Sequence, residues 1–77
     1  MKERVHIEAL ENDDFAIKVG DKIIGRLLRT AEWNGYDCIL EFESSEPFDD
    51  FRVSSLMQGA FIIRNHYEKT FGKQLNL

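Results

Sequence analysis

The chain has 77 residues and a mass of 9.0 kDa, and 43% of its residues are hydrophobic and 12% aromatic. This length leaves room for one hydrophobic core and excludes a second domain. The hydrophobic content is too high for a disordered chain, and no apolar stretch approaches the ~20 residues that cross a bilayer. We therefore expect one soluble domain over residues 1–77, with no part in the membrane.

The first residues and the cysteine content indicate the compartment. The segment from Met1 to His6 lacks the basic, then apolar, then small-residue order of a secretory signal. The single cysteine, Cys38, has no partner for an internal disulfide, which fits a reducing environment. The sequence therefore predicts a cytoplasmic protein.

The charge is negative overall and unevenly distributed. Ten basic and 14 acidic residues give a net charge of −4, and an acidic chain of this size is a poor general binder of polyanions. Four of the basic residues fall between residues 15 and 29, whereas residues 30–51 carry seven acids and no base. We expect a folded molecule with one basic and one acidic region.

The order of apolar and polar residues predicts four β-strands in the first part of the chain. They lie at about residues 4–10, 15–19, 22–33 and 36–43. Asn34-Gly35 predicts a two-residue hairpin between the third and fourth strands, because a type I′ turn needs positive φ at both central positions. Such a turn sets the register and pairs Trp33 with Tyr36.

The apolar residues of this predicted sheet do not all fall on one face. Ile17 and Ile24 lie on one side, whereas Leu27 and Phe42 lie on the other. A bulge at Gly25 would reconcile the two hairpins, because the extra residue changes which face the following side chains occupy. Without a bulge, the uncovered apolar side chains would form an interface for a homodimer or another protein.

The C-terminal part predicts one helix, at about residues 54–71. Ser55 and Gly72 suit its two ends, as an N-cap and a left-handed C-terminal residue. Apolar residues recur at spacings of three and four, which places them on one face. This stripe consists of Val53, Leu56, Ala60, Ile63, Tyr67 and Phe71, widened by Met57 and Phe61. The predicted fold is α+β: an antiparallel β-meander of three to four strands followed by one C-terminal helix packed on the sheet.

Patterns typical of catalysis or metal binding are missing from the sequence. The two histidines, His6 and His66, are far apart, and no His-x-x-His, Cys-x-x-Cys or Glu-x-x-His spacing occurs. No glycine-rich segment builds a phosphate loop. Cys38 lies inside a predicted strand, as a small buried hydrophobe does. We expect no enzymatic activity, no catalytic or metal site, no cofactor and no small-molecule substrate.

Small size, uneven charge and the lack of a catalytic pattern favour a non-enzymatic interaction module that binds a protein partner through its sheet or an acidic loop. Its small size is typical of regulators and inhibitors from phages or mobile elements, and we expect a protein of this kind. The expected contact residues are two apolar residues of the third strand and a group of acids. They are Ile24, Leu28, Glu41, Glu43, Glu46, Asp49 and Asp50.

Two other interpretations remain open from the sequence. In the first, the basic strand binds nucleic acid, with cations on phosphates and aromatic rings stacked on bases. Its residues are Lys18, Lys22, Arg26, Arg29, Trp33 and Tyr36. In the second, the acidic residues reproduce the charge spacing of a nucleic-acid backbone and occupy the basic groove of a partner.

Overall fold

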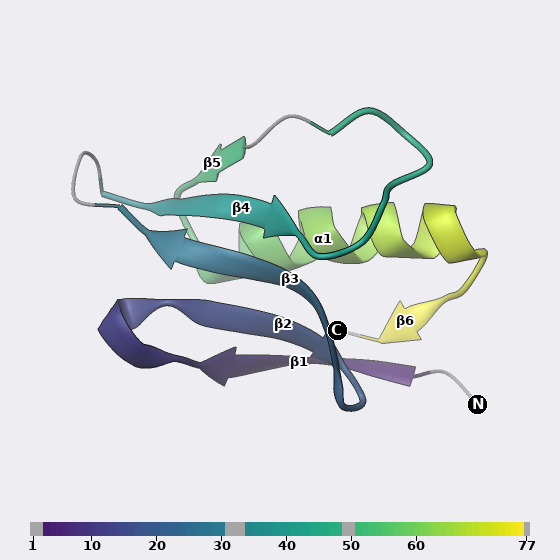
Figure 1. Ribbon diagram of the computed structural model, residues 1–77, viewed down its shortest axis with the longest axis horizontal. Coiled ribbons are helices and arrows are strands. Elements are labelled where there is room, and N and C mark those ends of the chain that lie inside the picture. Colours follow the sequence, from purple (N-terminus) through teal and green to yellow (C-terminus); the bar gives the residue numbers. More distant parts are fainter. Residues whose placement is uncertain (1–2, 31–33, 49–50, 77) are drawn as a thin grey trace.

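The computed structural model describes residues 3–30, 34–48 and 51–76, and in this part of the chain six strands form one curled sheet with a long helix on one face (Figure 1). The strand order is β5-β4-β3-β2-β1-β6. Neighbouring strands are antiparallel, except that β6 runs parallel to β1. The elements are β1 (Glu3–Ala9), the 3-10 helix η1 (Glu11–Asp13), β2 (Phe15–Val19), β3 (Lys22–Arg29), β4 (Tyr36–Leu40), β5 (Phe51–Val53), α1 (Leu56–Phe71) and β6 (Leu75–Asn76).

The α+β class and the C-terminal helix are confirmed, and the predicted meander corresponds to β1 to β4. The prediction of three to four strands was too low, because β5 and β6 were missed. These strands are three and two residues long, too short to show an alternating pattern. β6 forms because the chain turns back after Gly72, and the Leu75 N–H donates to Glu68 Oε2 at 2.7 Å.

The predicted register of the β3–β4 hairpin is wrong. Arg29, not Trp33, pairs with Tyr36, and Leu27 pairs with Cys38, so the strands are shifted by four residues and joined by residues 30–35. Residues 31–33 lie outside the described part. The observed register brings Leu27 and Cys38, both 0% exposed, together in the core. Core packing therefore overrides the turn preference of Asn34-Gly35, and because the shift is even, each side chain keeps its predicted face.

The sequence left open whether a bulge beside Gly25 reconciles the two hairpins, and the structure contains this bulge. Ile17 pairs with Gly25 but Lys18 pairs with Ile23, which leaves Ile24 as an extra residue in β3. Ile24 and Leu27 are both 0% exposed, although they are three positions apart in a strand. The bulge thus places the apolar residues of both hairpins in one core under α1.

The helix begins and ends as its sequence predicts. Ser55 Oγ accepts a hydrogen bond from the Gln58 N–H at 3.1 Å, and Gly72 has a left-handed conformation with φ of 65°. The predicted apolar stripe is correct from Val53 to Tyr67 along its centre line and wrong for its last and flanking members. Val53, Ala60, Ile63 and Tyr67 are buried and Leu56 is half-buried, whereas Met57, Phe61 and Phe71 are exposed. Their exposed fractions are 51% for Met57, 43% for Phe61 and 45% for Phe71.

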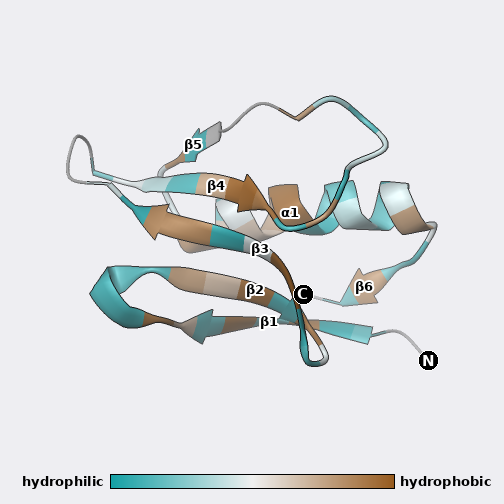
Figure 2. Cartoon of the chain, viewed as in Figure 1, coloured by the Kyte–Doolittle hydropathy of each residue, from teal (hydrophilic) through white to brown (hydrophobic). Residues whose placement is uncertain are grey.

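Close packing between α1 and β3 depends on two glycines. A Cβ atom at Gly59 would lie 2.5 Å from Leu27 Cδ2, and one at Gly25 would lie 2.7 Å from Ile63 Cδ1. Each element therefore places a branched side chain against a glycine of the other. This contact sets the distance between helix and sheet, and the hydrophobic residues of β2, β3 and β4 gather beneath it (Figure 2).

We predict that Gly59→Ala destabilises the protein, even though alanine is the better helix former by about 1 kcal/mol. The added methyl group would overlap Leu27, and overpacking of this kind costs about 1–3 kcal/mol. Chemical denaturation measures the difference. Asn65→Ala, on the exposed side of α1, is the control and should stay within about 0.5 kcal/mol of the original protein. Equal or higher stability of Gly59→Ala would contradict the close contact.

Candidate functional site

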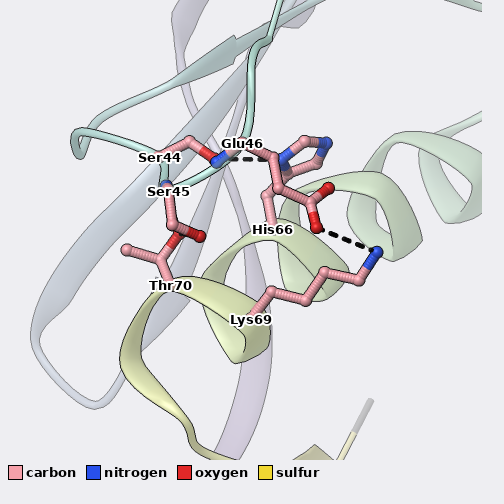
Figure 3. A network of polar contacts seen from close by, with 6 residues as sticks. All are labelled: Ser44, Ser45, Glu46, His66, Lys69 and Thr70. Carbon is pink, nitrogen blue, oxygen red and sulfur yellow. Dashed lines mark hydrogen bonds and ion pairs between the residues drawn. The ribbon is translucent and has the colours of Figure 1, made fainter.

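The segment between β4 and β5 leaves the sheet and is bound to the second half of α1 (Figure 3). Ser44 Oγ lies 3.1 Å from His66 Nδ1, and the Ser45 N–H donates to Thr70 Oγ1 at 3.0 Å. The third polar contact is an ion pair between Glu46 and Lys69 at 3.5 Å, and together the three contacts hold residues 44–46 against residues 66–70 of the helix.

Aromatic rings hold the same segment on both sides of these polar contacts. Phe48 packs edge-on against the His66 ring, with centroids 4.9 Å apart and planes at 87°. Phe42 packs in the same manner against Tyr67 at 5.4 Å. Edge-to-face pairs of this kind stabilise by about 0.5–1.5 kcal/mol beyond their buried area. We call residues 41–48, held in this way, the clamped loop.

A hollow of about 390 Å³ lies between the clamped loop and the end of β4. β5 pairs with Tyr36, Asp37 and Cys38 only, so the last residues of β4 border the hollow instead of a neighbouring strand. Five of its seven lining residues are apolar in type, but polar atoms of the backbone and of Ser44 and Glu46 make up most of the surface that it exposes. The lining residues are Ile39, Leu40, Phe42, Ser44, Glu46, Pro47 and Phe48.

Ser44 and His66 lie as close as a catalytic serine and its general base do. This contact is better explained as a hydrogen bond that holds the clamped loop on α1. The Glu46 N–H donates to Ser44 Oγ at 3.2 Å, which orients the hydroxyl. Nucleophilic catalysis needs a base that is itself oriented by a third group. Among the described residues His66 makes no ion pair with a carboxylate; its second neighbour is the Phe48 ring. The same residues contain no group of three histidine, cysteine, aspartate or glutamate side chains able to hold a metal ion.

The structure brings three of the predicted acidic residues together on the clamped loop. Glu41 is paired with Arg26 at 3.0 Å and Glu46 with Lys69, whereas Glu43 is exposed and makes no ion pair with any described residue. Asp49 and Asp50 lie outside the described residues.

The two apolar residues predicted as contacts do not join the acids. Ile24 is 0% exposed beneath α1, so its side chain does not reach the surface. Leu28 is half-buried, and its register partner in β4 is Asp37.

The structure divides the basic residues predicted for nucleic-acid binding between the two faces of the sheet. Lys18 and Arg26 point away from α1, where they pair with Glu8 at 3.2 Å and with Glu41. Lys22 lies on the helix side, 5.4 Å from the centre of the Phe71 ring.

Of the three remaining members of that set, Arg29 and Tyr36 lie at the opposite end of β3 from Lys22. Arg29 lies over the Tyr36 ring at 5.4 Å, and Tyr36 itself packs against Phe15. Trp33 is outside the described residues. These cations therefore do not line one continuous surface.

Four residues of the clamp were not recognised from the sequence: Ser44, Ser45, His66 and Thr70. The serines were interpreted only as a break between strand and helix, and His66 as a surface residue. Partners in these contacts are 22 to 25 positions apart. No local pattern signals a contact at this separation.

Comparison with known proteins gave no relative: no family model, no curated protein and no solved structure matches this chain. In the part of the chain that the structure describes, no helix is long and apolar enough to cross a membrane.

We predict that Ser44→Ala loosens the clamped loop without unfolding the domain. The substitution removes the acceptor of the Glu46 N–H and the hydroxyl beside His66, and a hydrogen bond of this kind contributes about 0.5–1.5 kcal/mol. Amide exchange at Glu46 should accelerate several-fold, while exchange at Ile63 in the core stays unchanged. Glu43→Ala is the control, since this side chain makes no ion pair with the described residues. Unchanged exchange at Glu46 would show that the Ser44 hydroxyl does not hold the loop.

Proposed function

We propose that this protein is a non-enzymatic interaction module that binds a protein partner through the clamped loop. The observation that supports this most is the hollow between the clamped loop and β4, where apolar side chains lie beside polar atoms and Glu46, with the exposed Glu43 next to the lining residues Phe42 and Ser44 in the sequence. Apolar centres with polar, charged rims are the usual composition of protein interfaces. The clamp also restricts the loop before binding, which lowers the entropic cost of association.

The chemistry of the hollow indicates the kind of partner. Phe42, Pro47 and Phe48 would accept an apolar side chain. Glu43, which is exposed and unpaired within the described residues, would face a lysine or arginine next to that side chain. Opposite charge across an interface increases the rate of association and its specificity. We propose that the partner presents an apolar residue flanked by a basic one.

Binding rather than catalysis agrees with the content of the hollow. Its polar side chains are Ser44 and Glu46, and both are already engaged with α1. We propose that the module acts without a cofactor or metal. Its action in the cytoplasm is part of the same proposal, since the single cysteine, Cys38, is buried and forms no disulfide.

Nucleic-acid binding by the basic strand has less support. Lys18 and Arg26 are already paired with carboxylates, and Lys22 lies on the opposite side of the sheet from them. Mimicry of a nucleic acid has a similar weakness, because Glu41 and Glu46 are neutralised by their own ion pairs. Both remain outcomes of the experiment below.

The experiment captures partners from an extract of the native host with the immobilised protein and two charge variants. Glu43→Lys changes the rim of the hollow, and Glu11→Lys makes the same change in η1, on an exposed residue outside the clamped loop. We expect one protein to bind the original chain and the Glu11→Lys control and to be lost with Glu43→Lys, because the rim charge is reversed.

Three results would contradict the proposal. Equal binding by both variants would exclude the loop as the contact. Captured nucleic acid whose affinity falls steeply with salt would favour the basic strand. A partner that normally binds nucleic acid and is competed off by it would favour mimicry.

A further inference from the structure

The outer edge of β1 is open over most of its length. On one side, β1 pairs with β2 from Val5 to Ala9. On the other side, β6 pairs with Glu3 and Arg4 only, and the described part of the chain places no strand beside the rest of that edge (Figure 1). An unpaired edge is a template for another strand.

The direction of the backbone groups along this edge follows from one hydrogen bond. The Leu10 N–H donates to the Asp14 carbonyl at 2.8 Å, one step beyond the pair of Ala9 and Phe15. In an antiparallel pair only alternate residues bond to the partner strand. The even-numbered residues of β1 therefore bond to β2, and the N–H and C=O groups of the odd-numbered residues point outward. The parallel pair of Arg4 and Asn76 uses the Val5 N–H, so the open groups are the Val5 C=O and both groups of Ile7 and Ala9.

Apart from the charge of Glu8, this edge lacks the usual devices that prevent pairing. From Val5 to Ala9 it contains no proline and no lysine, and its pairing with β2 has no bulge. Ile7 is 37% exposed although it lies on the same face as α1, because the helix packs on β3, β4 and β5. Apolar surface thus adjoins the open row of backbone groups.

We propose that the protein forms a homodimer in which β1 pairs antiparallel with β1 of a second copy, with the two-fold axis at Ile7. The two Ile7 residues would then exchange both of their hydrogen bonds, and each Ala9 N–H would donate to the Val5 C=O of the other copy. The two sheets join into one continuous sheet. This surface is separate from the clamped loop, so the inference does not depend on the proposed function.

A two-fold axis could also pass through His6 or Glu8, and charge favours the axis at Ile7 over these two. With the axis at Ile7, His6 lies opposite Glu8 of the second copy, twice in the dimer, and an imidazole beside a carboxylate is favourable. Moving the axis by one residue places Glu8 opposite Glu8, or His6 opposite His6. Glu8 already pairs with Lys18 at 3.2 Å. With the axis at Ile7, each Glu8 carboxylate gains His6 of the other copy as a second favourable neighbour.

The ends of the strand fit the same arrangement. β6 ends at Asn76 opposite Arg4, so a partner strand has to stop near Ala9 of its own copy. At Leu10 the chain turns toward β2 and enters η1, where Asn12 and Asp13 have positive φ. The five residues from Val5 to Ala9 are therefore the length that the open edge can accept.

Sedimentation over micromolar to submillimolar concentrations tests the dimer. Ile7→Pro removes an outward N–H without breaking a bond to β2, and Ile7→Lys places a charge on the edge. Each is expected to raise the dimer dissociation constant at least about tenfold. Met57→Lys, at an exposed apolar residue of α1, should leave the constant unchanged. A monomer at all concentrations in the original protein would overturn the proposal.

The register is tested by cysteine cross-linking under mild oxidation. Residues opposite each other in a hydrogen-bonded antiparallel pair have Cα atoms about 5.5 Å apart, which a disulfide can bridge. Ile7→Cys should cross-link, because Ile7 faces itself, and Ala9→Cys should not, because Ala9 faces Val5. The natural thiol, Cys38, is 0% exposed and contributes little background. Equal cross-linking of both variants, or none, would exclude this register.

Discussion

The reciprocal contact between glycines and branched side chains sets the arrangement of the whole domain. Leu27 of β3 lies against Gly59 of α1, and Ile63 of α1 lies against Gly25 of β3. Neither contact leaves space for a Cβ atom, so the two backbones approach more closely than two ordinary faces would. Cys38 Sγ, 4.0 Å from the Gly59 carbonyl, fits the same narrow space. One helix can therefore seal a core in a chain of 77 residues.

The position of α1 over β3, β4 and β5 has consequences on both sides of the sheet. On the β5 side, the second half of the helix extends past the short β5 and receives the clamped loop through His66, Lys69 and Thr70. On the β1 side, the main helix contacts are absent and Ile7 stays partly exposed. The proposed partner surface and the proposed dimer edge thus lie at opposite margins of one sheet, because the helix packs mainly on the half formed by β3, β4 and β5.

The face of the sheet away from α1 is covered by ion pairs instead of a second layer. Lys18 with Glu8, Arg26 with Glu41 and Arg52 with Asp37 connect neighbouring strands across it. Such exposed pairs contribute about 0–1 kcal/mol each, so they add little stability. Their long side chains shield Ala16, which is 0% exposed. This face therefore combines small or half-buried apolar residues with paired charges.

The sequence by itself determined the class of the fold, the order of its main elements and both ends of α1, and it left the bulge beside Gly25 as one of two alternatives. The determined features depend on local preferences, such as alternation along a strand, the Ser55 cap and the left-handed Gly72, that neighbouring residues express without the rest of the molecule. Tertiary structure decided what local preference could not. The core required Leu27 opposite Cys38, and this overrode the hairpin signal of Asn34-Gly35. The clamp joins Ser44 to His66 across 22 positions, and the exposure of Phe61 and Ile7 depends on where α1 lies. Contacts between distant segments are determined by which packing buries the most apolar surface, and that depends on all the elements together.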